Sequence, residues 1–299
     1  MRTDLDHLPP RKQRDLERVV RILFEEFEQI IGRATQDWKK RGRILKLILY
    51  GSHARGDWVE DRASGYSSDY DILVVVNDAR LTDPIDYWSN ANDRLLDEEL
   101  ITKRIGAPVN FIVHDLADVN DQLSCGRPFF ADIIRDGVAL YEAGGFPLAR
   151  PRKLPPEEAR AEAQRYFDEW LPSADRFLAS TNFFIQREGY KEAAFVLHQA
   201  TERLYHCLLL VLTLYSPKLH NIGRLRSLAE DRESRLIEAW PRATRKDRAR
   251  FEKLRDAYVK ARYSPHYTIS GEELAWLSEH VAVLQALVKR ACEERLAGG

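Results

Sequence analysis

The sequence predicts an α+β protein of two domains: an N-terminal α/β domain with a small mixed sheet, and a C-terminal all-α up-and-down helical bundle. Three observations support this fold class. Short apolar runs rich in β-branched residues occur in the first half of the 299-residue chain, segments of helical periodicity fill the second half, and a stretch with two Gly and four Pro lies between them. The length also exceeds the roughly 100–200 residues of a typical single domain.

The first domain, residues 1–143, is predicted to combine strands and helices. Apolar residues at helical spacing over Leu16–Ile31, shortly after Pro9 and Pro10, indicate a helix. The strands are expected at Ile44–Tyr50, Ile72–Val76, Val109–Val113 and Val138–Tyr141. The segments Ile85–Ile101 and Asp115–Asp136 have helical patterns, so we expect a small α/β domain.

Residues 144–158 are predicted to be a linker, because they contain the two Gly and four Pro and have no apolar period. The second domain, residues 159–299, shows no strand pattern. Its helices are expected at Pro156–Ser180, Gly189–Tyr215, Asn221–Trp240, Thr244–Ala261 and Gly271–Ala297. Helices of this length and number favour an up-and-down bundle.

The composition excludes several classes of protein. The longest apolar stretch, Cys207–Leu214, is far shorter than the ~20 residues of a membrane helix. Met1–Arg14 is polar and charged, unlike a signal peptide. The three cysteines are odd in number and widely spaced, at Cys125, Cys207 and Cys292, which argues against a disulfide framework or a zinc site. We therefore expect a cytoplasmic protein without a membrane partner.

The net charge of −1 is the sum of two unlike halves. Residues 1–150 carry 21 basic and 26 acidic residues, whereas residues 151–299 carry 25 and 21. Between Trp240 and Arg262, nine basic residues stand against three acidic ones. Such a helix is commonly a solvated face, but it could also bind the phosphates of RNA or of a nucleotide. The asymmetry suggests that the two halves do different work.

Two short motifs in the first half indicate phosphate chemistry. The sequence GSHARGD follows the strand that ends at Tyr50, and SDYD opens the next strand. Because side chains alternate along a strand, Asp69 and Asp71 project on one face, where two carboxylates favour a cation such as Mg²⁺. Gly51 allows the backbone to approach a phosphate, whose charge Arg55 could neutralise. The motifs therefore predict metal-assisted phosphoryl or nucleotidyl transfer.

This combination resembles the nucleotidyltransferases of the DNA polymerase β superfamily, which carry Gly-Ser-x-Ala-Arg-Gly followed by Ser-Asp-x-Asp, over roughly Leu16–Glu142. The matching positions are Gly51, Ser52, Ala54, Arg55, Gly56, Ser68, Asp69 and Asp71. The resemblance implies a nucleoside triphosphate, taken to be ATP, bound by Gly51, Ser52, Arg55 and Ser68. It also implies that Asp69 and Asp71 hold Mg²⁺ and are catalytic.

The sequence departs from this family's pattern in two places. The loop Asp57–Ser67 is longer than in minimal members, and Asn110 stands where a third carboxylate is expected. An amide cannot act as a base, so Asp115, His114 or Glu60 would have to substitute. A nucleotide-binding sensor without catalysis is therefore an alternative.

The second half resembles the HEPN domain, a helical bundle found fused or paired with minimal nucleotidyltransferases, over roughly Pro156–Leu296. The resemblance rests on the sequence LHQATE at 197–202, the turn from Pro217 to His220, and the segment ARYSPHY at 261–267. In the same helix His198, Glu202 and Tyr205 fall at i, i+4 and i+7. Such a histidine is expected to be a hydrogen-bonded core residue rather than a catalyst.

Ribonucleolytic HEPN members carry an Arg, then four to six intervening residues, then a His, with a Tyr shortly after it. Here three residues, including Pro265, separate Arg262 from His266, so this chain is one residue short of that spacing. As a catalytic pair Arg262 and His266 would suit metal-independent RNA cleavage, in which His moves a proton and Arg stabilises the phosphorane. Alternatively, the two cations cap the C-terminus of the helix.

The leading interpretation is a nucleotidyltransferase-like protein that binds Mg²⁺ and a nucleoside triphosphate and transfers a nucleotidyl group, as in AMPylation, to a protein or small-molecule hydroxyl. Resemblance to paired members that AMPylate a tyrosine near the HEPN motif makes Tyr263 and Tyr267 candidates for self-modification. Resemblance to aminoglycoside nucleotidyltransferases implies a small hydroxylated acceptor instead. The alternatives are a HEPN ribonuclease or toxin-like effector acting on RNA, and a non-catalytic nucleotide sensor. Because bundles of this type commonly self-associate, we expect a homodimer.

Overall fold

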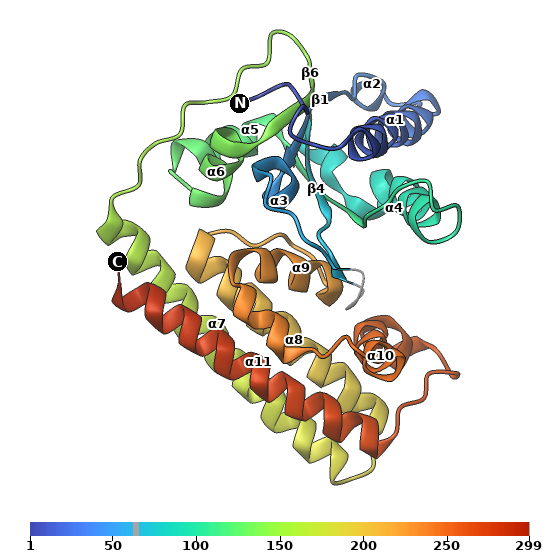
Figure 1. The fold of residues 1–299 in the computed structure, drawn as a ribbon, viewed down its shortest axis with the longest axis vertical. Helices are drawn as coiled ribbons and strands as arrows, with labels where there is room; N and C mark the ends of the chain where they lie inside the picture. The colour runs from blue at the N-terminus through green and yellow to red at the C-terminus, as the bar shows by residue number, and fades with distance from the viewer. Residues whose placement is uncertain (62–65, 299) are drawn as a thin grey trace. The chain divides into compact units, whose positions relative to one another are not determined.

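The computed structural model describes residues 1–61 and 66–298 (Figure 1). The chain divides into two compact units, one that reaches to Lys153 and one that begins at Leu154. The first contains a four-stranded mixed sheet with helices, and the described residues from Leu154 onward form helices joined by loops, with no strand among them. The predicted fold class is therefore confirmed.

The first unit alternates strands and helices in the order that the apolar patterns indicate. Its helices are α1 (Pro10–Gly32), α2 (Asp37–Lys40), α3 (Gly51–Arg55), the 3-10 turn η1 (Ala79–Thr82), α4 (Pro84–Leu100), α5 (Leu116–Ser124) and α6 (Pro128–Asp136). Its strands are β1 (Ile44–Tyr50), β2 (Glu60–Asp61), β3 (Tyr66–Ser67), β4 (Tyr70–Val76), β5 (Val109–Asp115) and β6 (Val138–Glu142). The predicted helix at Leu16–Ile31 and the four predicted strands are confirmed.

The main sheet has the strand order β5-β4-β1-β6. β1 runs antiparallel to both β4 and β6, whereas β4 and β5 are parallel. Asp71 on β4 therefore has Tyr50 opposite it on β1 and Asn110 opposite it on β5. This register brings the end of β1, the start of β4 and the start of β5 to the same edge of the sheet.

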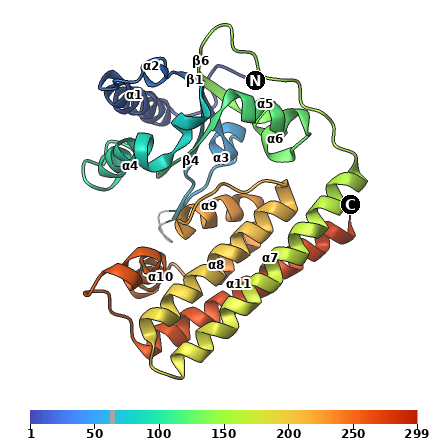
Figure 2. The same ribbon diagram turned by 180° about the vertical axis from the view of Figure 1, so that it is seen from behind.

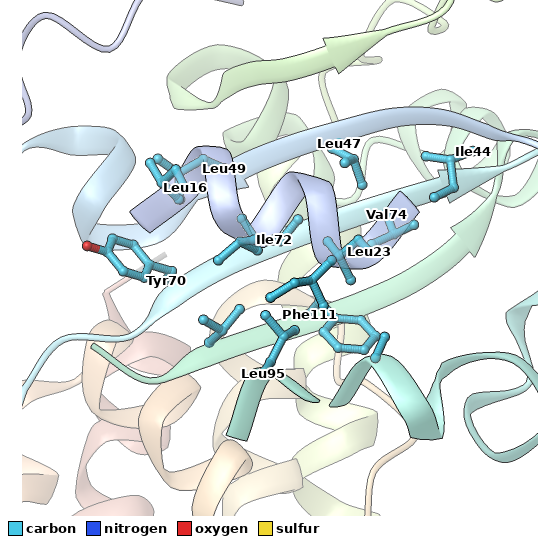
Figure 3. Packing of buried hydrophobic residues seen from close by; sticks show 14 of the residues in the cluster. Leu16, Leu23, Ile44, Leu47, Leu49, Tyr70, Ile72, Val74, Leu95 and Phe111 are labelled. Carbon is cyan, nitrogen blue, oxygen red and sulfur yellow. The ribbon is translucent and has the colours of Figure 1, made fainter. Parts of the chain in front are cut away.

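The sheet is buried against α1 and α4 (Figure 3). Leu16 and Leu23 of α1 project toward the sheet, where they meet side chains such as Ile72 and Phe111, and Leu95 of α4 lies in the same cluster. β1 and β4 are buried along their whole length, which explains why they appear in the sequence as continuous apolar runs rather than alternating ones. This rigid core supports the strand ends that carry the two motifs.

The helical pattern predicted across Asp115–Asp136 is confirmed at both ends and wrong in the middle, because the structure has α5 and α6 there with a break between them. Gly126 has φ of +72°, a left-handed conformation that ends a helix, and Pro128 begins α6 at a position that needs no N–H. The glycine and the proline at this turn therefore interrupt the helix, although the helical spacing of apolar residues continues across the turn. The short α2 and the β2–β3 hairpin were not predicted.

The second unit is a bundle of long helices (Figure 2). Its elements are α7 (Pro156–Ile185), α8 (Tyr190–Thr213), α9 (Ile222–Arg232), the 3-10 turn η2 (Ser234–Ala239), α10 (Arg245–Tyr263) and α11 (Gly271–Ala297). α8 packs against α7, α9, α10 and α11, and most of its residues are buried. α8 is therefore the central helix of the bundle, and polar residues on it are enclosed on several sides.

The one helix predicted at Asn221–Trp240 is also wrong, because α9 ends at Arg232 and a 3-10 turn follows. Glu233 between them has extended backbone, and its side chain accepts a hydrogen bond from the N–H of Arg235. Local side-chain bonding of this kind competes with helix continuation. None of the described helices combines the length and apolarity that crossing a bilayer requires.

Candidate functional site

Gly51 forms the junction between β1 and α3, where the first motif begins. Its φ is +74°, and a Cβ placed on it would lie 2.7 Å from Oδ2 of Asp71. A residue with a side chain would thus be strained in its backbone and would collide with the carboxylate. Because only glycine fits both conditions, β1 and β4 can bring the first motif directly against the second.

The two carboxylates of the second motif lie around the first residues of β4. Asp69 directly precedes the strand and is partly buried, whereas Asp71 lies within it and is buried. Asn110 on β5 donates a hydrogen bond from Nδ2 to Oδ2 of Asp69 over 2.6 Å. The structure therefore brings together Gly51, Asp69, Asp71 and Asn110 from three neighbouring strands.

Ser68 and Arg55, both predicted to bind phosphate, have partners within the loop that joins the motifs. Oγ of Ser68 accepts from the N–H of Val59 over 2.9 Å, and the N–H of Ser68 donates to the carbonyl of Val59. Nε of Arg55 donates to Oδ2 of Asp57 over 3.1 Å, and the Arg55 side chain is partly exposed. Ser52 is buried in the first turn of α3. Ser68 thus closes the loop at its base.

Glu99 is a residue of this site that the sequence analysis missed. It lies one residue before the end of α4 and is partly buried. Burial, and then the negative charge of Asp69, raise the pKa of Glu99 to about 7. In the sequence Glu99 belongs to an acidic run at the end of a helix, which is typical of a solvated face. Only the packing of α4 beside the sheet brings it near Asp69.

The three residues considered as substitutes for a third carboxylate lie elsewhere. Asp115 is the last residue of β5, five residues beyond Asn110, and its side chain caps α5. At ~3.3 Å per residue this places it about 16 Å along the strand from Asn110. Nδ1 of His114 lies 2.5 Å from Oδ2 of Asp118 on α5. Glu60 lies on β2, 3.9 Å from Nζ of Lys12.

In the second unit, Arg262 and His266 occupy the C-terminal turn of α10 and the loop after it. Nε of Arg262 donates to the carbonyl of Tyr258 over 2.6 Å, and its guanidinium lies 4.5 Å from the Tyr258 ring and 4.9 Å from the Phe195 ring. The side chain of His266 is exposed, and its N–H donates to Oγ of Ser264. In the described part of the chain, no hydrogen bond joins Arg262 to His266.

A different histidine lies on the same tyrosine ring as Arg262. His220 stacks on Tyr258 with the rings 4.7 Å apart and 13° from parallel. Nδ1 of His220 lies 3.2 Å and 3.3 Å from the two carboxylate oxygens of Glu202. Glu202 is buried, whereas the His220 side chain is 61% exposed. A buried carboxylate thus holds an accessible imidazole that contacts the same tyrosine ring as Arg262.

Two more histidines border Glu202 from the same face of α8. His198 and His206, one turn before and after, lie 3.8 Å and 4.0 Å from its carboxylate. Burial lowers the pKa of each to about 4. Burial also raises the pKa of Glu202, which the hydrogen bond from His220 opposes. His198 is thus fully buried, as expected of a core histidine, but the sequence did not indicate that His220 joins it.

The basic residues between Trp240 and Arg262 are mostly paired. The ion pairs are Arg242–Glu230, Lys246–Glu272, Arg250–Glu272, Lys253–Glu273, Arg255–Glu252 and Lys260–Asp256. Within the residues that the structure describes, Arg262 has no carboxylate within 4.0 Å. The excess charge of this helix is therefore largely neutralised, and Arg262 is one of the few basic residues here without such an ion pair among the described residues.

The described residues contain no group of three or more His, Cys, Asp or Glu side chains that could hold a metal ion. Asn110 accounts for part of this finding, because it places an amide where a third carboxylate would complete such a group. The donors that remain are two carboxylates. Two carboxylates suit Mg²⁺, which usually takes one or two from the protein and completes its shell with water and phosphate oxygens.

Comparison with known proteins gives two findings. Residues 167–290 match the family model described as the HEPN domain. A protein of Methanocaldococcus jannaschii named "putative protein adenylyltransferase" is 34% identical to this chain over 106 residues, which make up 34% of this chain and 84% of that protein. The chain thus resembles one protein through a third of its length and a separate domain family through its second unit.

Proposed function

Because the chain belongs to the nucleotidyltransferase family of this archaeal relative and also carries a HEPN domain, we propose that its first unit transfers a nucleotidyl group from a nucleoside triphosphate to a hydroxyl. The observation that carries the proposal is the convergence of Gly51 with Asp69 and Asp71 at one edge of the sheet. The name of the relative supports an adenylyl group and a protein acceptor.

The donor set fits Mg²⁺, which Asp69 and Asp71 would hold. The ion would supply neutralisation of the triphosphate charge. Around it, Gly51 keeps the backbone open to a phosphate, and Ser52, Arg55 and Ser68 are proposed to bind triphosphate oxygens. These residues position the α-phosphorus for attack and leave the bond-making to the acceptor.

In the proposed reaction, the acceptor oxygen bonds to the α-phosphorus, the bond to the β-phosphate bridge breaks, pyrophosphate leaves, and the hydroxyl proton must go to a base. Asn110 cannot take that proton. Glu99 is the candidate proton acceptor, because it is partly buried near Asp69 and has a pKa of about 7. A base works best when its pKa lies near the working pH.

The two tyrosines considered as acceptors differ sharply in exposure. The Tyr263 side chain is 74% exposed. Tyr267 is buried, and its hydroxyl donates to the carbonyl of Lys253 over 3.0 Å. Burial also raises the pKa of Tyr267. We therefore propose Tyr263 as the protein acceptor, and a small hydroxylated molecule as the alternative.

The test is incorporation of label from α-³²P-ATP with Mg²⁺. We expect labelling by the wild type, loss of at least 100-fold in Asp69→Asn plus Asp71→Asn, and no change in Asp93→Asn, an exposed control on α4. Tyr263→Phe, but not Tyr267→Phe, should remove self-labelling. Equal labelling of the wild type and the double variant would overturn the proposal. ATP binding without transfer would leave the sensor function instead.

The second unit supports a second candidate function, cleavage of an RNA phosphodiester. The observation that favours it is Arg262, which lacks a carboxylate partner among the described residues, beside the Glu202–His220 pair. Glu202 can hold Nδ1–H of His220 so that Nε2 takes the proton of a 2′-hydroxyl. That oxygen then bonds to phosphorus, the 5′-oxygen leaves with a proton from solvent, and Arg262 stabilises the added charge.

Cleavage of an end-labelled oligoribonucleotide in EDTA tests this candidate. His220→Asn keeps a donor toward Glu202 but has no proton-accepting nitrogen, so we expect about a 100-fold loss. His266→Asn should cleave as the wild type does. Loss of cleavage in His266→Asn, together with normal cleavage in His220→Asn, would support the Arg262 and His266 pair predicted from the sequence and would overturn the role of His220. Absence of cleavage by the wild type would overturn the candidate itself.

A further inference from the structure

His53 lies inside the first motif, between Gly51-Ser52 and Ala54-Arg55, and is completely buried. Its ring stacks with Trp58, at 5.7 Å and 7° from parallel, and lies 4.4 Å from the tilted ring of Tyr70. Contacts with two aromatic rings thus restrict the orientation of the imidazole. A buried imidazole held this firmly must have partners for its two nitrogens.

Both ring nitrogens of His53 have a partner in the first unit. Nδ1 lies 2.9 Å from the backbone carbonyl oxygen of Asp69, and Nε2 lies 3.4 Å from Nζ of Lys12. A carbonyl oxygen can only accept a hydrogen bond, so Nδ1 must carry the hydrogen. Nε2 is then the nitrogen that accepts from Lys12. The contacts therefore specify one neutral tautomer of His53.

The surroundings of Lys12 reinforce this tautomer. Lys12 is buried on α1, and its Nζ lies 3.9 Å from a carboxylate oxygen of Glu60. The same Nζ lies 5.7 Å from the centre of the Trp58 ring and 5.6 Å from the centre of the Tyr70 ring. Tyr70 in turn donates to Asp15 of α1. A proton on Nε2 would point at the ammonium, and a second positive charge would lie beside the first. Burial and the charge of Lys12 accordingly lower the pKa of His53 to about 4.

The bond from His53 joins the two halves of the candidate site. Asp69 is attached through its backbone to α3, and its side chain is attached through Asn110 to β5. The hydrogen bond from His53 thus fixes the backbone from which the Asp69 carboxylate projects. Outer contacts that orient a ligand typically change metal affinity by about 10–100-fold when they are removed.

We propose that His53 is a positioning residue that fixes the Asp69 backbone, and so its carboxylate, for metal binding, by donating from Nδ1 while Nε2 accepts from Lys12. This inference rests on the proposed function, because it takes Asp69 to be a metal ligand. It adds a role for the variable position of the motif and for a buried lysine of α1. It also predicts that metal affinity depends more on where the side chain of residue 53 carries its hydrogen-bond donor than on how polar that side chain is.

Two variants of His53 separate these properties. In His53→Asn the amide nitrogen can take the place of Nδ1, whereas in His53→Gln the amide nitrogen reaches toward the place of Nε2. Binding of Mn²⁺, measured by electron paramagnetic resonance without nucleotide, should weaken about 10-fold or more in His53→Gln and by less than about threefold in His53→Asn. Thermal unfolding followed by circular dichroism establishes that both variants fold.

The tautomer is measured separately, by ¹⁵N NMR of the wild-type imidazole in metal-free protein at pH 7. We expect the Nδ1–H form, and finding the Nε2–H or the charged form would overturn the inference whatever the metal does. Equal Mn²⁺ affinity in the wild type and both variants would also overturn it. Absence of Mn²⁺ binding by the wild type would overturn the proposed metal site, and this inference with it. The wild-type titration alone distinguishes that outcome from the others.

Discussion

The acidic groups of the two units have opposite neighbours. In the first unit Asp69 lies close enough to Glu99 to raise its pKa, and the third-carboxylate position beside it holds the amide of Asn110. In the second unit Glu202 is bonded to His220 and bordered by two further histidines. Acids gathered together gain stability when a cation binds, whereas an acid that has its own imidazole is equipped to move protons. The first arrangement therefore predicts dependence on metal, and the second predicts dependence on pH without metal.

The largest effect on transfer activity is expected from adding a side chain at Gly51, where the first motif lies directly against the second. In Gly51→Ala the new Cβ would meet Asp71 at 2.7 Å in a backbone with φ of +74°. We expect nucleotidyl transfer to fall on the order of 100-fold and the free energy of unfolding to fall by about 1–3 kcal/mol. Labelling from ATP and urea denaturation measure the two effects.

Gly145 offers the matched control for this variant. Its φ is +86°, but nothing lies within 4 Å of the place where a Cβ would be. Gly145→Ala therefore has the backbone strain without the collision, and it should keep full transfer activity. If Gly51→Ala transfers as well as Gly145→Ala, the close approach to Asp71 is not needed and the first site must be interpreted differently.

The motif residues were predictable because each motif lies at the end of an apolar run. The runs predicted the strands β1, β4 and β5, and the resemblance to nucleotidyltransferases implied that the motifs belong to one site. That resemblance also singled out Asn110. The register of the strands, which brings Gly51 against Asp71 and Asn110 opposite Asp71, comes from the structure.

Glu99 and His220 could not be found in this way, because each reaches its partner through tertiary packing. Glu99 approaches Asp69 only because α4 ends beside the sheet, and His220 approaches Glu202 only because the chain turns back after α8. A polar residue at the end of a helix looks the same in the sequence whether or not a partner lies opposite. The spacing of Arg262 and His266 likewise did not indicate that Arg262 lies against the Tyr258 ring, and their role as a catalytic pair stays a prediction.

Acid should destabilise the second unit through its buried histidines. The pKa of His206 is lowered to about 4 from 6.5, so the unfolded chain binds a proton first, and stability is lost as pH falls from 6.5 toward 4. At pH 5 the loss is about 2 kcal/mol for one such histidine. In His206→Gln this part of the loss should vanish, whereas in the exposed control His266→Gln it should remain. Urea denaturation at pH 7.5 and pH 5 measures it, and equal pH dependence in all three proteins would contradict the burial argument.

Asn110→Asp converts the first unit's site into a more acidic one. The new carboxylate would stand where the amide now donates to Asp69 over 2.6 Å, so a hydrogen bond becomes a repulsion. Without metal we expect the free energy of unfolding to fall by about 1–2 kcal/mol. Millimolar Mg²⁺ should recover most of the loss, because the cation then lies among three carboxylates. Asn90→Asp, exposed on α4, is the control in which Mg²⁺ should change nothing.

Glu99→Gln should produce the smallest effect, and its sign depends on pH. The pKa of Glu99 is raised to about 7 from 4.5, so the folded protein holds the proton more tightly than the unfolded chain does. Stability is therefore complete below pH 4.5 and is lost as pH rises through 7. In EDTA the variant should match the wild type at pH 4.5 and exceed it by about 1 kcal/mol or less at pH 8, because solvent screens a half-buried group.

Asp69 must be part of the cause if the two acids belong to one site. Asp69→Asn removes the charge that raises the pKa of Glu99, so the gain from Glu99→Gln at pH 8 should shrink in that background. Glu28→Gln, an exposed change on α1, should show no pH-dependent gain in either background. An undiminished gain would mean that burial alone raises the pKa of Glu99. Glu99 would then be a carboxyl group with no electrostatic link to the proposed metal ligands, and the acidic cluster of the first unit would contain only Asp69 and Asp71.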